Sequence, residues 1–200
     1  MENARPDTKS RIMETAIQMF SAENYERVTM RDIAAAVGIK AASLYNHFNS
    51  KDEILTCIYE LFEETAAGIK PPLAEIVGMA DSAPPRAVVS YAFFYFQSVD
   101  QEKMLRILNI AHMMSRIDRR SREFFQYHVF DVLRLYTEEA LKKLLALGRI
   151  EPLDIEDFLT LQAYFCYSAI LRSLMPGARV EEEWEHGLSA LLSLVKSTGK

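Results

Sequence analysis

The stretch from Val28 to Lys51 constrains the fold of this chain more than any other segment. It has the pattern of two short helices joined by a tight turn, with a third helix starting at its end. Thr29 suits the N-cap of the first helix, and Asp32 suits the reciprocal half of a capping box. The first helix is marked by apolar residues at helical spacing, namely Met30, Ile33, Ala34 and Val37. Gly38 then ends it, because a helix terminus often needs a left-handed residue.

The second helix of this stretch, expected over residues 41–48, has two contrasting faces. Its inner face carries Ala41, Leu44 and Phe48. Its outer face carries small or hydrogen-bonding residues, namely Ala42, Ser43, Asn46 and His47. Small side chains allow close approach, while hydroxyl, amide and imidazole groups can bond to base edges. The pattern therefore favours a helix that enters the major groove of DNA. The alternative is a compact helical corner with ordinary solvated side chains.

A third helix is expected from Ser50 to about Ala67. Ser50 and Glu53 have the spacing of a capping box at its start. Lys51 follows at the positive end of the helix dipole, where a phosphate oxygen is attracted. This helix starts against the two shorter helices, which together form the DNA-reading segment (29–48), and it runs on into the rest of the chain. A shift of its far end would therefore move the second of those helices, the reading helix (41–48).

The order of residues from Thr29 to Ile54, with the block L-Y-x-H-F-x-S-K inside it, resembles the DNA-binding domain of the tetracycline-repressor (TetR) family of bacterial transcription regulators. The resemblance extends weakly back to about Arg11. It implies that the outer-face residues of the second helix meet the bases. It implies that phosphates are held by Thr29, Arg31, Tyr45 and Lys51.

Two positions depart from the family pattern. The family often has Ser before the recognition helix and then Lys or Arg, whereas this chain has Lys40 and Ala41. The chain therefore lacks the usual capping residue of that helix, and Lys40 is expected to supply the positive charge instead.

The composition favours a packed helical protein. Half of the 200 residues are hydrophobic, and there are only seven Gly and seven Pro. The formal net charge of −5 does not by itself indicate a nucleic-acid binder, and residues 1–55 carry nearly equal numbers of basic and acidic side chains. We therefore expect few phosphate contacts per subunit and a strong dependence on docking geometry.

Several classes of protein are disfavoured by missing motifs. The cysteines, Cys57 and Cys166, have no metal-ligand spacing and suit buried free thiols. We find no glycine-rich phosphate loop, nucleophile motif or cofactor site, so no enzymatic activity is expected. The N-terminus has no signal-peptide pattern, and the longest apolar run, 87–96, is too short to span a bilayer. A cytoplasmic location without a membrane partner is expected.

The fold class predicted is all-α, with an N-terminal three-helix helix-turn-helix domain over 1–52 and a larger helical domain over 53–200. The first helix is expected over 7–22. Beyond residue 85 the periodicity predicts five helices, over 86–99, 102–115, 118–147, 154–175 and 180–196.

The larger domain is rich in aromatic residues and Met, which at helical spacing usually form plain core. The family resemblance implies that this domain holds a small hydrophobic or aromatic effector. The candidate lining residues are Phe93, Phe96, Leu108, His112, Met113, Phe124, His128, Tyr164 and Tyr167. Each histidine, taken singly, also suits a satisfied core position.

A basic cluster lies between two of the predicted helices, at Arg116, Arg119, Arg120 and Arg122. It suits solvated surface. The alternative is a pocket mouth that receives a carboxylate or phosphate, for instance of an acyl-CoA-like effector.

The last two helices carry wide apolar faces that need a partner surface. The family resemblance implies that they pair with their twins in a four-helix homodimer interface. The residues concerned are Phe158, Leu161, Phe165, Trp184, Leu188, Leu191, Leu192 and Val195. A two-fold dimer presents two recognition helices, so a palindromic double-stranded operator is expected.

These expectations combine into a transcriptional repressor that a small effector releases from DNA. The effector can weaken DNA binding only as far as its affinity differs between two arrangements of the dimer. The rival interpretation is an effector-independent DNA-binding or protein-interaction module.

Overall fold

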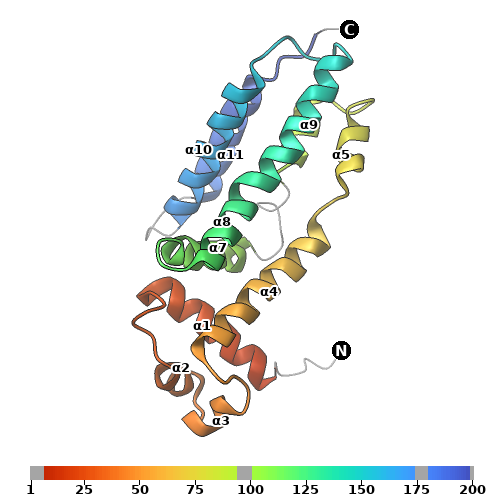
Figure 1. Ribbon diagram of the computed structural model, residues 1–200. Coiled ribbons are helices and arrows are strands. Elements are labelled where there is room, and N and C mark those ends of the chain that lie inside the picture. Colours follow the sequence, from red (N-terminus) through yellow and green to blue (C-terminus); the bar gives the residue numbers. More distant parts are fainter. Residues whose placement is uncertain (1–6, 94–100, 174–179, 199–200) are drawn as a thin grey trace. The chain divides into compact units, whose positions relative to one another are not determined.

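The computed structural model describes residues 7–93, 101–173 and 180–198, and these residues are helical throughout apart from loops and an isolated bridge between Ile150 and Ser197 (Figure 1). The all-α prediction is confirmed. The described residues divide into two compact units, 7–68 with 102–122, and 69–93 with 101, 123–173 and 180–198. No helix within the described ranges is both long and apolar enough to cross a membrane.

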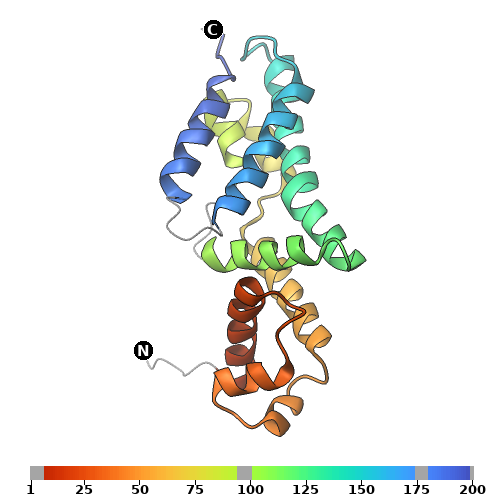
Figure 2. The same ribbon diagram turned by 90° about the vertical axis from the view of Figure 1, so that its left-hand side faces the viewer.

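The first unit contains the N-terminal helices, red to orange in Figure 2, and the later residues 102–122. Its elements are α1 (Thr8–Glu23), α2 (Met30–Val37), α3 (Ala41–Tyr45), α4 (Lys51–Ile69), α7 (Gln101–Met114) and the first turn of α8 (Arg119–Gln126). The last residue of α4 and the first residue of α7 are assigned to the second unit.

The ends of α1 follow from two polar residues. Asp7 is the N-cap, and its carboxylate accepts a 2.7 Å bond from the backbone N–H of Ser10. Asn24 ends the helix with a φ of 75°, a left-handed conformation that Asn tolerates better than most residues. The buried face of α1 consists of Ile12, Ala16, Ile17 and Phe20, which form the core of the N-terminal helices.

The long helix α4 starts at Lys51 and continues to Ile69, close to the predicted span. Ser50 caps it, because its hydroxyl accepts from the N–H of Glu53 at 3.0 Å. The Glu53 carboxylate accepts a 2.7 Å bond from the N–H of Asn49, whereas in a capping box it would accept from the N–H of Ser50. The predicted domain boundary after residue 52 falls in the first turn of this helix, and it stays a prediction.

The second unit contains helices that precede and follow a π-helical turn in the chain. Its elements are α5 (Leu73–Met79), α6 (Pro85–Tyr91), the end of α8, the π-helical turn η2 (Tyr127–Asp131), α9 (Val132–Ala146), α10 (Ile155–Ser173) and α11 (Val180–Ser193). Helix α5 was not among the predicted helices. The helix predicted over 86–99 is α6 as far as residue 91, and residues 94–99 lie outside the described ranges.

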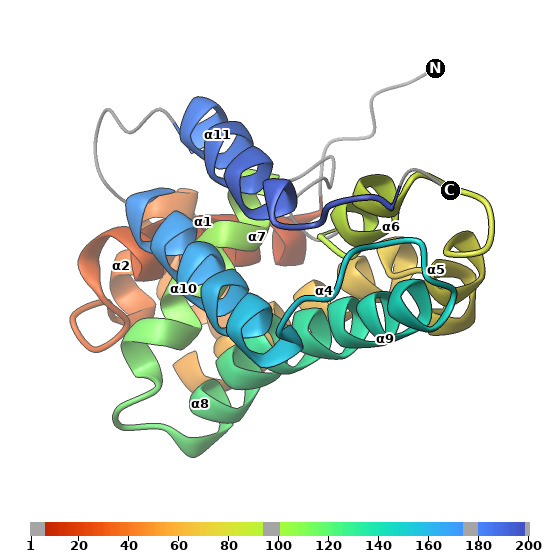
Figure 3. The ribbon, with the colours of Figure 1, turned by 90° about the horizontal axis from the view of Figure 1, so that it is seen from above.

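Loops of the second unit are fastened by Arg149, whose guanidinium donates to the carbonyls of Ala80 at 2.7 Å and Ala83 at 2.9 Å. Helices α10 and α11 lie side by side (Figure 3). They approach closely because Gly187 has no side chain; a Cβ there would lie 2.3 Å from the ring of Phe165. That ring is 4.7 Å from the ring of Trp184.

Candidate functional site

The first helix of the candidate site, α2, has the predicted caps at both ends. The Thr29 hydroxyl accepts from the N–H of Asp32 at 3.2 Å, and the Asp32 carboxylate accepts from the N–H of Thr29 at 2.9 Å. These bonds lower the pKa of Asp32. At the other end Gly38 has a φ of 79°, and the N–H of Ile39 returns to the carbonyl of Ala34 at 2.9 Å. The capping box at Thr29 is confirmed.

The next helix, α3, is shorter than predicted. It ends at Tyr45 instead of Phe48, and Asn46 and His47 form a turn. Leu44 and Phe48 are almost fully buried and anchor the segment on the core. Its N-cap, Lys40, makes no side-chain capping bond, as the departure from the family pattern suggested. A five-residue helix cannot hold itself in place, so packing positions it.

Most of the residues predicted to meet DNA are exposed on this segment. Seven of the nine are exposed, namely Thr29, Arg31, Lys40, Ala42, Tyr45, Asn46 and His47. Ser43 is half-buried. The ring of Tyr45 is 51% exposed, which is unusual for an aromatic side chain beside a packed core. The stretch from Thr29 to His47 therefore exposes hydroxyl, amide, imidazole and cationic groups to solvent.

Lys51, the ninth residue, is half-buried and occupied within the chain. Its ammonium group donates to the carbonyl oxygens of Tyr25 at 2.7 Å and Val28 at 2.8 Å. Burial lowers its pKa. Two of its three donors thus hold the loop between α1 and α2, and the phosphate role implied by the resemblance stays a prediction.

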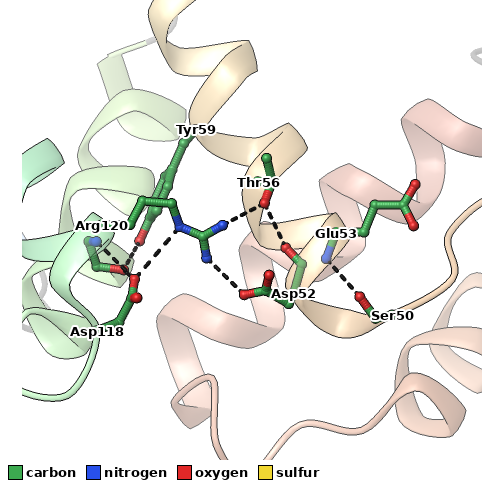
Figure 4. A network of polar contacts seen from close by, with 8 residues as sticks. Ser50, Asp52, Glu53, Thr56, Tyr59, Asp118 and Arg120 are labelled. Carbon is green, nitrogen blue, oxygen red and sulfur yellow. Dashed lines mark hydrogen bonds and ion pairs between the residues drawn. The ribbon is translucent and has the colours of Figure 1, made fainter.

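Sequence reasoning missed a polar network beside this segment, drawn in Figure 4. Arg120, predicted as part of a solvated cluster, donates to a carboxylate oxygen of Asp52 at 2.8 Å and to the hydroxyl of Thr56 at 2.6 Å. The hydroxyls of Tyr59 and Ser121 are joined by a buried 2.7 Å bond. Burial raises the pKa of Tyr59 to about 12. A sequence signal for the network was only the spacing of Asp52, Thr56 and Tyr59 on one helical face.

The other three arginines of the predicted cluster, Arg116, Arg119 and Arg122, are exposed. Arg122 donates to the backbone carbonyl of Ser115 at 3.3 Å. Arg120 differs from these three arginines, because its guanidinium is bonded to Asp52 and Thr56 of α4. While these bonds persist, it cannot bind a carboxylate or phosphate of a ligand.

The predicted effector residues fall in both units. Leu108, His112 and Met113 lie on α7 in the first unit, where burial lowers the pKa of His112. The others within the described ranges are Phe93, Phe124, His128, Tyr164 and Tyr167, in the second unit. Phe96 lies outside the described residues.

The second-unit members have different surroundings. Phe93 packs edge-on against the rings of Phe165 and Trp184, with centroids at 6.4 and 5.9 Å. Phe124 and His128 have ring centroids 4.5 Å apart. Burial, with a further contribution from Lys70, lowers the pKa of His128 to about 4, so its imidazole is neutral at physiological pH.

A groove of about 430 Å³ lies in the second unit between α10 and the stretch from the end of α8 to α9. Apolar side chains dominate its lining, among them Val129, Phe130, Leu133, Leu159 and Ala163. Of the predicted effector residues Tyr164 lines this groove, and its side chain is 70% exposed. The groove also borders Gln162, a buried residue whose amide makes no hydrogen bond within the described part of the chain.

The predicted interface residues divide into two groups. Phe158, Trp184, Leu191 and Val195 are buried within the protomer, where they hold α10 and α11 in place. Leu161 is 50% exposed. The half-buried members are Phe165, Leu188 and Leu192. Exposed apolar residues also include Tyr164 on α10 and Leu194 just after α11, which the sequence pattern did not separate from core.

Comparison with known proteins agrees with this geometry. Residues 12–57 match the model of the family described as bacterial regulatory proteins, tetR family. IcaR of Staphylococcus aureus strain Newman, a negative transcriptional regulator of the biofilm operon icaADBC, is 50% identical over 46 residues, which are 23% of this chain. The match spans 25% of the length of IcaR.

Two solved structures share the fold over nearly the whole chain. The ketosteroid transcriptional regulator KstR2 of Mycobacterium tuberculosis has a TM-score of 0.66 at 20% identity, covering 97% of both chains. The SmeT–triclosan complex has a TM-score of 0.64 at 19% identity, covering 96% of this chain and 93% of SmeT. Residues 12–57, which include the capped α2–α3 pair, thus match the tetR family of bacterial regulatory proteins, and the two solved structures share the fold of the chain.

Proposed function

We propose that this chain is a DNA-binding transcriptional regulator without enzymatic activity, and that it acts as a repressor. The observation that carries the proposal is the exposed stretch on and beside α3, held against the core by Leu44 and Phe48. Its small and hydrogen-bonding side chains suit the major groove. The negative regulator IcaR, which is 50% identical over 46 residues, supports repression rather than activation.

The contacts proposed divide by chemistry. Ala42, Ser43, Asn46 and His47 meet base edges, which specify sequence. Phosphates are held by Thr29, Arg31, Lys40 and Tyr45, which fix the register. Lys51 joins that second set through the third N–H of its ammonium group, because the other two donate to the loop. Because the chain is acidic overall, few phosphates are neutralised per subunit.

A two-fold homodimer places two reading segments on one duplex. The apolar surface of α10 and α11 supports this assembly, because Leu161 and Leu194 are about half exposed and border one hollow. Half-sites about one helical turn apart, or a multiple of it, follow from the symmetry.

A small hydrophobic or aromatic effector is proposed to bind the second unit. The apolar groove between α10 and η2–α9 supports this, as does the SmeT complex, which holds triclosan. An acyl-CoA is the form of this proposal in which the effector carries phosphates as well as an apolar chain. A shift in melting temperature distinguishes the two forms: triclosan stabilises the protein if an apolar ring suffices, and palmitoyl-CoA does so if the phosphates matter.

The experiment that tests DNA binding is selection from a random duplex library, with sequencing of the retained DNA. The expected result is an enriched palindrome whose affinity falls steeply with salt. Recovery of unselected sequences alone would overturn the proposal. If a palindrome is enriched and neither probe nor a wider panel of small apolar molecules changes the melting temperature, the effector-independent module is correct.

A further inference from the structure

One face of α4 is fastened to the turn that begins α8, within the first unit. Asp52, Thr56 and Tyr59 occupy this face at intervals of four and three residues, the spacing of neighbours on a helix. Figure 4 shows all three directed toward the segment that contains Asp118 and Arg120. The contact at Asp52 is a partly exposed ion pair with Arg120, and the contact at Tyr59 is a buried hydrogen bond with Ser121.

The guanidinium group of Arg120 makes the ionic half of this fastening. One of its terminal nitrogens donates to Asp52 at 2.8 Å, and the other donates to the Thr56 hydroxyl at 2.6 Å. Its Nε lies 3.8 Å from a carboxylate oxygen of Asp118, and the group lies 5.7 Å from the ring centre of Tyr59. A planar fork that bonds two residues one turn apart fixes the rotation of that turn, which a lysine would not do.

The turn so fixed is directly joined to the DNA-reading segment. Asp52 follows Lys51, whose ammonium group holds the carbonyls of Tyr25 and Val28. Val28 in turn precedes Thr29, the N-cap of α2. A rotation of the first turn of α4 therefore pulls on the backbone from which α2 starts.

We propose that Arg120 is a positioning residue for DNA binding, which acts through Asp52 and Lys51 on the orientation of α2 and α3. The proposal rests on the proposed function. Arg120 itself touches no DNA. When its fork is lost, the first turn of α4 samples other orientations, and the apparent affinity for DNA falls in proportion to the fraction of protein that is still competent to bind.

A double-mutant cycle with Arg120→Gln and Asp52→Asn in the full-length protein tests this. The probe is the duplex enriched by the selection above, and fluorescence anisotropy gives Kd for each protein. We expect each single variant to bind about five- to tenfold more weakly, and the double variant to bind as either single variant does. The Asp52→Asn result is the sharper one, because removing an acid near DNA would by simple charge strengthen binding.

Two measurements separate positioning from other roles. The dependence of Kd on salt should keep the wild-type slope in Arg120→Gln, whereas a phosphate contact would lower the slope by about one unit. Tyr59→Phe is the matched control, since it removes the buried bond to Ser121 and leaves the fork intact. It should lower the melting temperature and leave Kd within about twofold.

Unchanged affinity in Arg120→Gln, stronger binding by Asp52→Asn, additive effects in the double variant, or a reduced salt slope would each overturn the proposal. Failure of the wild type to enrich any duplex is a different outcome, because it removes the proposed function, and the positioning role of Arg120 falls with it.

Discussion

The ammonium nitrogen of Lys51 lies 2.7 Å from the carbonyl oxygen of Tyr25 and 4.2 Å from the centre of the same residue's ring. One residue thus ties the start of α4 to the loop between α1 and α2 by a charged hydrogen bond and a cation–π contact. Charge-assisted bonds of this kind are stronger than neutral ones. The contact explains why a loop with few regular backbone bonds keeps α2 in place.

The first prediction concerns this contact. Lys51→Met keeps the apolar stem and removes the charged donor from two carbonyl groups, so we expect the free energy of unfolding to fall by about 1–3 kcal/mol. Urea denaturation measures it. Lys40→Met, at an exposed position, is the control and should change stability by less than about 0.5 kcal/mol. Equal stabilities, with a smaller salt slope for DNA binding by Lys51→Met, would instead show that Lys51 holds a phosphate.

A second prediction concerns the close approach of α10 and α11. Gly187→Ala places a Cβ against the Phe165 ring, which is packed on Trp184, so we expect a loss of about 1–3 kcal/mol of stability. Gly78→Ala is the matched control, since no atom lies within 4 Å of its added Cβ. There the better helix propensity should stabilise α5 by about 0.5–1 kcal/mol. The two thermal unfolding curves should move in opposite directions, and a common direction would contradict the argument.

A third prediction concerns the amide of Gln162, which is 2% exposed and has no hydrogen-bond partner in the described residues. Gln162→Leu removes an unsatisfied polar group at similar volume, so we expect stability to rise by about 1–2 kcal/mol. For a chain of this size that is a rise of roughly 2–8 °C in Tm. Gln18→Leu, at an exposed site, should change Tm little. A fall in Tm for Gln162→Leu would mean that the amide has a partner, such as buried water.

A fourth prediction concerns pH. The pKa of His128 is about 4 in the folded chain, because the ring is buried, against 6.5 for a free imidazole. Between these values the unfolded chain binds a proton that the folded chain does not. The contribution of His128 to the free energy of unfolding is therefore complete above about pH 6.5. It is lost as the pH falls toward 4, by up to about 3 kcal/mol. Urea unfolding of the wild type and His128→Asn from pH 4.5 to 7.5 should give a steeper dependence for the wild type; parallel curves would show that His128 titrates normally.

A fifth prediction concerns the reading segment. His47→Ala removes an exposed imidazole, so it should leave Tm nearly unchanged while weakening binding to the selected duplex about tenfold or more. Arg116→Ala, which removes an exposed charge from the first unit away from this segment in sequence, should bind within about twofold of wild type. Comparable binding by the wild type and both variants would remove His47 from the site.

Local patterns predicted the reading segment well, because its signals are short in range. The capping box of Thr29 with Asp32 and the left-handed Gly38 depend on residues within a few positions, and both are confirmed. The early end of α3 was not predictable in this way, because the anchoring of Phe48 and the turn at Asn46 depend on packing against other helices.

Long-range contacts were the part that the sequence concealed. Arg120 and Asp52 are 68 residues apart, and the spacing of Asp52, Thr56 and Tyr59 on one helical face does not identify Arg120 as their partner. In α10 and α11, likewise, the helical spacing of apolar residues is the same for residues that pack in the core and for residues that are exposed. Phe158 faces the protomer core while Leu161, three positions later, is half exposed, and both fit the same stripe.

The π-helical turn η2 explains a regularity that a plain α-helix would not sustain. From α8 through α9 the buried residues recur in two columns at intervals of four, namely Phe124, His128, Val132, Tyr136, Ala140 and Leu144, and Phe125, Val129, Leu133, Thr137 and Leu141. At 3.6 residues per turn, each such interval overshoots a full turn by about 40°. A wider turn takes up part of that overshoot. Because a π-helical turn contains one residue more than an α-helical turn for about the same rotation, deleting one residue from η2 would restore a plain α-helix there and leave the side chains before and after it on one buried seam.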